Sequence, residues 1–96
     1  MVKFLAAAIG CASIAAAVVA SAEPPAGAAS CSGCHPTSAR VTSPVPRLAG
    51  LDRAAIVRAM QDFRSGQRAS TVMDRIAKGF TDDEIQAIAS WYATQR

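Results

Sequence analysis

The sequence predicts a small all-α protein, and two observations support this prediction. No segment of the 96 residues alternates apolar and polar side chains in the way that a half-buried β-strand does. In the C-terminal half, two segments repeat apolar residues at three- and four-residue spacing, and each follows a residue typical of a helix start. We therefore expect about four helices, joined by connections that contain proline, glycine and serine.

The first 22 residues have the features of a secretory signal peptide. Lys3 precedes an uncharged, alanine-rich apolar run from Phe4 to Ala20, and Ala20-Ser21-Ala22 is a small-x-small cleavage site. We expect removal of residues 1–22 and export to the periplasm, which leaves residues 23–96 as a single domain without a membrane span. The alternative is a retained anchor, although the run is shorter than the roughly 20 residues that cross a bilayer.

Cys11 follows Gly10 inside this apolar run, so a lipoprotein cleavage site is a second alternative. Ala8 stands where such sites usually carry a branched aliphatic residue, and few apolar residues precede it. We therefore interpret Cys11 as an incidental small residue of the leader.

The expected domain is small enough that its apolar core alone would be marginal. The whole chain has a formal net charge of +3, part of which comes from Lys3 in the leader. This mild charge lacks the clustered basic face of a nucleic-acid-binding domain, so we predict no nucleic-acid partner.

The first half of the domain contains little regular structure in our prediction. Ala28 to Cys34 can form a short helix, which Pro36 ends soon afterwards. Thr37 to Gly50 should be a loop, because Pro44 and Pro46 disfavour helix at these positions and at the residues before them.

A longer helix is expected from Arg53 to about Ser65. Asp52 is a suitable N-cap, and Gly66 stops the helix. Four apolar residues share one face of it: Ile56, Ala59, Met60 and Phe63.

Two further helices complete the predicted set. Thr71 to Lys78 looks like a short helix with Gly79 at its C′ position. Thr81-Asp82-Asp83-Glu84 is a capping box that starts a last helix at Asp82, running to near the C-terminus. The apolar stripe of this helix consists of Ile85, Ile88, Ala89 and Tyr92.

The run Cys31-Ser32-Gly33-Cys34-His35 is a C-x-x-C-H motif, the signature of covalent c-type haem attachment. Both thiols would add to the haem vinyl groups, and His35 would bind the iron from one side. A thioredoxin-like redox motif should lie beside a βαβ pattern, and a zinc site needs two further ligands. A haem-free thiol module remains an alternative. We predict one covalent haem c that also supplies much of the core.

The second axial position has two candidates, because His35 is the only histidine and the domain contains two methionines, Met60 and Met73. Met60 lies on an apolar helical stripe, where methionine is usually a core residue. Met73 follows a polar connection after the helix that would wall the pocket. We therefore predict Met73 as the distal ligand, with an open distal site as the alternative.

Pro46-Arg47-Leu48-Ala49-Gly50 is the segment that we expect to support His35. A metal-bound histidine normally donates its other ring N–H to an acceptor. The Pro46 carbonyl is a candidate acceptor, and Leu48 would then pack against the macrocycle. The alternative is an ordinary turn.

These features together resemble the class I cytochromes c, in the order C-x-x-C-H, Pro46-x-Leu48-Ala49-Gly50, a methionine, and a final helix with Trp91-Tyr92. Phe63 to Arg68, Ser70 to Phe80 and the helix after Thr81 are similar to the cytochrome subunit of flavocytochrome c sulfide dehydrogenase. The chain departs from many members at Pro36, where they carry glycine. The resemblance supports Cys31 and Cys34 as haem attachment sites and His35 and Met73 as iron ligands.

The resemblance implies an electron-transfer subunit, not catalytic alone, that accepts electrons from an FAD-containing flavoprotein oxidising sulfide and passes them to a downstream acceptor protein. The alternatives are an independent monohaem carrier and a haem enzyme with an open distal site. Four basic residues near Met73 are candidates for partner docking or for a solvated face: Arg64, Arg68, Arg75 and Lys78.

Overall fold

A computed structural model of the protein describes residues 2–3, 10–16 and 23–96. The predicted cleavage site at Ala20-Ser21-Ala22 and much of the predicted apolar run lie outside the described residues. Among the helices that are described, none combines the length and the hydropathy needed to cross a lipid bilayer.

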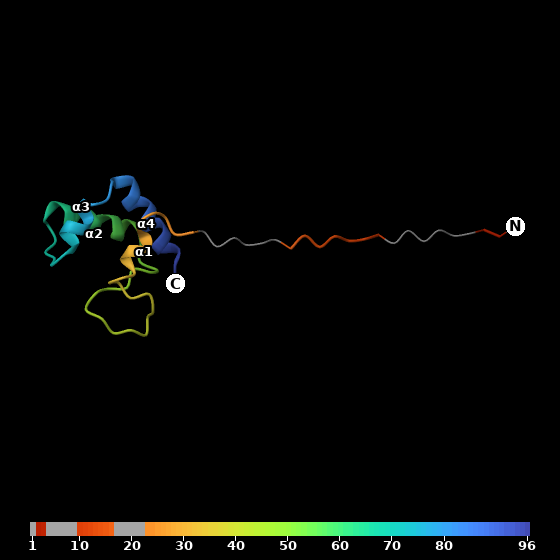
Figure 1. Ribbon diagram of the computed structural model, residues 1–96, viewed down its shortest axis with the longest axis horizontal. Helices are drawn as coiled ribbons and strands as arrows, with labels where there is room; N and C mark the ends of the chain where they lie inside the picture. The colour runs from red at the N-terminus through yellow and green to blue at the C-terminus, as the bar shows by residue number, and fades with distance from the viewer. Residues whose placement is uncertain (1, 4–9, 17–22) are drawn as a thin grey trace.

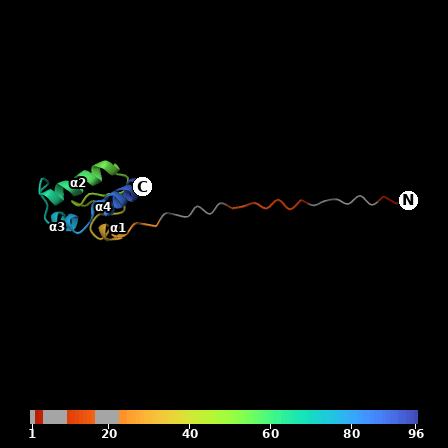
Figure 2. The same cartoon turned by 90° about the horizontal axis from the view of Figure 1, so that it is seen from above.

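Four helices and no strand occur in the described part of the chain, which confirms the all-α prediction. The helices are α1 (Ala28–Cys31), α2 (Arg53–Ser65), α3 (Met73–Lys78) and α4 (Asp82–Thr94). Helix α2 packs against both α3 and α4 (Figure 1). Seen from above, α4 lies between α2 and α1 (Figure 2).

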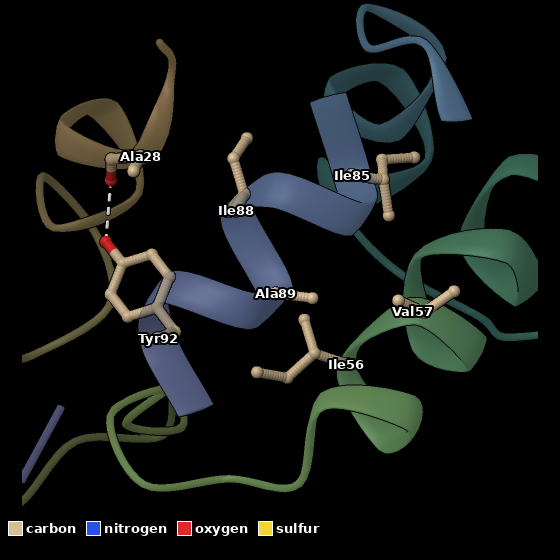
Figure 3. Packing of buried hydrophobic residues seen from close by; sticks show 7 residues of the cluster. All are labelled: Ala28, Ile56, Val57, Ile85, Ile88, Ala89 and Tyr92. Atoms are coloured by element: carbon tan, nitrogen blue, oxygen red, sulfur yellow. Dashed lines mark hydrogen bonds between the residues drawn. The ribbon is translucent and has the colours of Figure 1, made fainter. Parts of the chain in front are cut away.

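Helix α2 has the boundaries that its sequence predicts. The Asp52 carboxylate accepts a hydrogen bond from the Ala55 N–H at 3.1 Å, and Gly66 ends the helix with a left-handed φ of 81°. The buried part of the helix differs from the predicted stripe. Ile56 and Val57 are buried next to α4 (Figure 3), while the later stripe residues are only half-buried.

Helix α4 carries the core. The Thr81 hydroxyl accepts from the Glu84 N–H at 3.2 Å, and the Glu84 carboxylate accepts from the Thr81 N–H at 2.9 Å, so the predicted capping box is present. All four predicted stripe residues are buried and face Ala28 of α1 and two residues of α2 (Figure 3). No large side chain among the described residues is completely enclosed, so the apolar core is small.

The two short helices are shorter than predicted. Helix α1 ends at Cys31, and Cys34 lies in a tight turn, where N–H groups bond three residues back, as from Cys34 to the Cys31 carbonyl at 3.2 Å. Helix α3 begins at Met73 because Val72 is not helical (φ −141°). Gly79 is also not left-handed (φ −81°), so this glycine ends α3 without the expected C′ conformation.

Candidate haem site

The C-x-x-C-H segment forms a single turn at the end of α1. The Cys31 carbonyl accepts hydrogen bonds from two backbone N–H groups, from Cys34 at 3.2 Å and from His35 at 2.9 Å. Both cysteines are free thiols; Cys31 is half-buried and Cys34 is exposed. Burial raises the pKa of the Cys31 thiol, which keeps it protonated at neutral pH. The turn therefore brings two unpaired thiols and one imidazole together.

The predicted contact between His35 and Pro46 is present. The His35 Nδ1 lies 2.5 Å from the Pro46 carbonyl oxygen. A carbonyl can only accept, so Nδ1 carries the proton, and in the neutral imidazole Nε2 then keeps its lone pair. This tautomer is the one that a histidine needs to bind a metal through Nε2.

A second contact holds the loop that carries Pro46. The Arg47 Nε donates to the Thr37 carbonyl at 3.0 Å, which links the two ends of the loop. The Gly50 N–H donates to the Tyr92 carbonyl at 3.0 Å, which attaches the end of the loop to α4. The segment that follows the acceptor for His35 is therefore held by two hydrogen bonds.

A cavity of about 130 Å³ lies between this loop and the end of α4, next to His35. Leu48, Trp91 and Tyr92 are among the apolar side chains that line it, and Leu48 also packs against the core. Trp91 contributes a buried indole N–H with no hydrogen-bond partner among the described residues. Leu48 thus lies beside His35, and its contact with a macrocycle stays a prediction.

The two methionines lie in different surroundings. Met60 is half-buried and packs against the core cluster, as predicted. Met73 is the first residue of α3 and does not belong to that cluster. The residues around it expose apolar surface, 48% of Val72 and 37% of Ile76. Met73 therefore lies where an added apolar group would find uncovered side chains.

Tyr92 is a residue whose full role the sequence interpretation missed. Its hydroxyl donates to the Ala28 carbonyl at 2.6 Å, which connects α4 to α1, the helix that ends at Cys31 (Figure 3). Burial raises the pKa of Tyr92, and the neighbouring Cys31 adds to this effect. A buried tyrosine usually forms a hydrogen bond through its hydroxyl, so the sequence does suggest that Tyr92 has a partner. The periodicity of the helix does not identify that partner.

The basic residues near Met73 do not form one equivalent set. Arg64 turns toward its own chain, with Nη2 donating to the Phe80 carbonyl at 2.7 Å and Nη1 lying 2.5 Å from the Asp82 carboxylate. The Arg68 guanidinium lies 5.4 Å from the centre of the Phe63 ring. Part of the hydrogen-bonding capacity of Arg64 is therefore used inside the fold, and its role in docking stays a prediction.

Comparison with known proteins gives a consistent group of relatives. The chain is 44% identical over 63 residues to the cytochrome subunit of sulfide dehydrogenase of Chlorobaculum tepidum, which covers 66% of this chain and 57% of that protein. It is 37% identical over 65 residues to a thiosulfate dehydrogenase electron acceptor of Stutzerimonas stutzeri, of which it spans 30%. No family model matches the chain.

A third relative, cytochrome c-554(548) of Halomonas halodenitrificans, is 30% identical over 69 residues, and the match covers 68% of this chain and 83% of the relative. The chain belongs to the class I cytochrome c family. Its relatives are electron carriers, and covalent haem c is the cofactor that this cytochrome family implies.

The residues of this cytochrome are suited to holding a covalent haem. Two free thiols and an imidazole with an available Nε2 occupy one turn, which is the donor set for covalent attachment and axial ligation. The core is small, and apolar side chains near Met73 are partly exposed. A haem held by this turn would add the apolar contacts that so small a core lacks.

Proposed function

We propose that this cytochrome is an exported, single-haem electron acceptor for a flavoprotein that oxidises sulfide. The observation that carries the proposal is the 44% identity with the cytochrome subunit of a sulfide dehydrogenase. The chain spans 57% of that relative, so the activity of the whole relative comes to this chain only as part of the proposal.

In this proposal each site residue has one role. Cys31 and Cys34 would form the two thioether bonds, His35 would bind iron through Nε2, and Met73 would be the second iron ligand. The Pro46 carbonyl supports the proposal, because its contact with Nδ1 at 2.5 Å fixes the imidazole orientation and increases its basicity as a ligand.

The haem supplies one-electron oxidation and reduction of iron. The protein supplies ligation, burial and a surface near the exposed edge of the group. With His35 and Met73 both bound to the iron, no open site would remain for a substrate, which favours electron transfer over catalysis by this chain. Sulfide oxidation is then assigned to the FAD-containing partner, and a second exported protein receives the electrons.

The test uses the full chain, matured with covalent haem in the periplasm of a bacterial host. The purified protein should be reduced by dithionite and should show no sulfide-dependent turnover with a soluble cytochrome as acceptor. Addition of the flavoprotein that co-purifies from the native source should allow sulfide to reduce the haem rapidly. Catalytic sulfide oxidation by the haem protein alone, or the lack of any flavoprotein that reduces it, would overturn the proposal.

An independent carrier is the second candidate. One relative is the electron acceptor of a thiosulfate dehydrogenase, which favours this candidate. The match to cytochrome c-554(548), which covers 83% of that relative, also favours it. Reduction of the haem by thiosulfate with its dehydrogenase, but not by sulfide with a flavoprotein, would select this candidate.

A further inference from the structure

Helix α3, which begins with Met73, is too short to be stable by itself. It has six residues, and a single one of them, Ala77, is buried. Its N-cap residue, Val72, provides no side-chain hydrogen bond, although the Ser70 hydroxyl accepts from the Asp74 N–H at 3.0 Å. Besides the packing of α3 against α2, the position of Met73 therefore depends on contacts made by the ends of this segment.

The C-terminal end of the segment is held by Arg64. Its Nη2 donates to the Phe80 carbonyl at 2.7 Å, across 16 positions of sequence, and Met73 lies inside the loop that this bond closes. The same guanidinium pairs with Asp82, but that side chain is 79% exposed, so the ion pair contributes little. The half-buried bond to the carbonyl is the stronger constraint on the loop.

Phe80 also contacts the segment that carries the thiols. Its ring approaches Gly27 so closely that a Cβ on Gly27 would lie 2.5 Å from the Phe80 Cε1. Gly27 has a φ of 87° and is the N-cap of α1, four positions before Cys31. Phe80 therefore links the C-terminal end of the Met73 segment to the start of the C-x-x-C-H helix.

We propose that Arg64 is a positioning residue for Met73: by holding the Phe80 carbonyl, it keeps the ligand-bearing segment in register with the thiol-bearing segment. The proposal rests on the assignment of Met73 as distal ligand in the proposed function. Loss of this bond should favour release of Met73 from iron while covalent attachment through Cys31 and Cys34 continues.

The experiment titrates the ferric haem protein with imidazole, which binds iron only when the methionine has left. The apparent affinity for imidazole therefore reports the fraction of molecules with Met73 released. Arg64→Gln should raise this affinity about tenfold, the change expected from one charge-assisted hydrogen bond. Arg64→Lys should also raise it, because a lysine keeps the charge but lacks the rigid planar guanidinium that directs an N–H at the Phe80 carbonyl.

Two controls separate positioning from other effects. Arg58→Gln removes one positive charge from the exposed face of the same helix, and Met60→Ala destabilises the core cluster, to which no residue of α3 belongs. Both should retain the wild-type imidazole affinity. An equal rise in Arg58→Gln would indicate a general charge effect, an equal rise in Met60→Ala would indicate general destabilisation, and either result would overturn the proposal.

The remaining outcomes are also decisive. If Arg64→Gln does not accumulate with haem, Arg64→Lys carries the test, and a wild-type affinity in that variant overturns the proposal. A methionine–iron absorption band that is present in the wild type and lost in Met73→Ala, together with unchanged Arg64 variants, overturns this proposal alone. A wild type without the band overturns the ligand assignment and this proposal with it.

Discussion

Residues 52–95 and residues 27–50 of this cytochrome are held in place by different means. In the first region, two 13-residue helices have caps at both ends and bury a shared apolar face. Most of the information that forms them lies within a few residues of each element. Their folding follows from local sequence and from the packing of α2 against α4.

The region from 27 to 50 has four helical residues and then a loop. Ala28 is its one buried residue. Two hydrogen bonds attach it to α4, from Tyr92 to Ala28 and from Gly50 to Tyr92, and a third joins His35 to Pro46 within the region. This region also contains both thiols and the histidine.

The comparison indicates that the helical region provides a scaffold. We expect the motif-bearing region to depend on its cofactor for order. A covalent haem would connect the thiols of one region to the methionine of the other. Removing that connection should affect residues 27–50 much more than residues 52–95, and the predictions below test this difference.

The largest effect is expected from Cys31→Ala combined with Cys34→Ala. The variant should carry no covalent haem on a denaturing gel stained for haem, and it should lose cooperative thermal unfolding, because so small a core cannot replace the lost contacts. Any remaining hydrogen-exchange protection should be confined to α2 and α4. A double variant that unfolds cooperatively, with residues 27–50 protected, would show that the haem does not organise this region.

The next effect separates the two methionines. Thioether ligation opposite a histidine raises the reduction potential of a haem, so Met73→Ala should lower the potential and remove the methionine–iron absorption band. Met60→Ala should keep both properties and reduce the free energy of unfolding by about 2 kcal/mol, the low end for a core methionine, because Met60 is only half-buried. If Met60→Ala instead lowered the potential and removed the band, Met60 would be the iron ligand and Met73 the packing residue.

The helical region could be predicted from the sequence almost completely. Asp52, Gly66 and the Thr81–Glu84 box each act within one turn, so their effect is readable from neighbouring residues. The boundaries of the short helices were less accurate. They depend on conformations such as the non-helical backbone of Val72 (φ −141°), which propensity alone does not determine.

Parts of the candidate site could be predicted because they are contiguous motifs. The C-x-x-C-H turn and the Pro46 acceptor were expected, and the hydrogen bond between His35 and Pro46 is present. The contacts of Tyr92 with Ala28 and of Arg64 with Phe80 join residues 64 and 16 positions apart. Periodicity carries no information on such pairs, so these two contacts needed the structure.

A smaller effect is expected from Tyr92→Phe, which removes the hydrogen bond between the two regions and leaves the buried Ala28 carbonyl without its donor. The loss should be about 1–3 kcal/mol of unfolding free energy at neutral pH. The pKa of Tyr92 is raised in the folded protein, so its contribution is complete below the ordinary tyrosine pKa and disappears as the pH rises through the folded value. Denaturant unfolding should therefore give converging stabilities for wild type and variant in strong alkali. A constant difference up to that pH would contradict this role of the hydroxyl.

The smallest effect concerns the capping box, which belongs to the locally determined region. Thr81→Ala should lower the free energy of unfolding by about 1 kcal/mol and leave the haem spectrum unchanged, because the cap acts only on the first turn of α4.

The pKa of Glu84 is lowered because its carboxylate accepts the Thr81 N–H. The contribution of this carboxylate to stability is therefore present above the ordinary glutamate pKa and is lost as the pH falls through the folded value. Glu84→Gln should flatten that part of the acid dependence of thermal unfolding, since an amide can form the box without titrating. If Thr81→Ala instead altered the methionine–iron band, the two regions would be coupled through the start of α4, and the division between scaffold and cofactor-dependent region would be wrong.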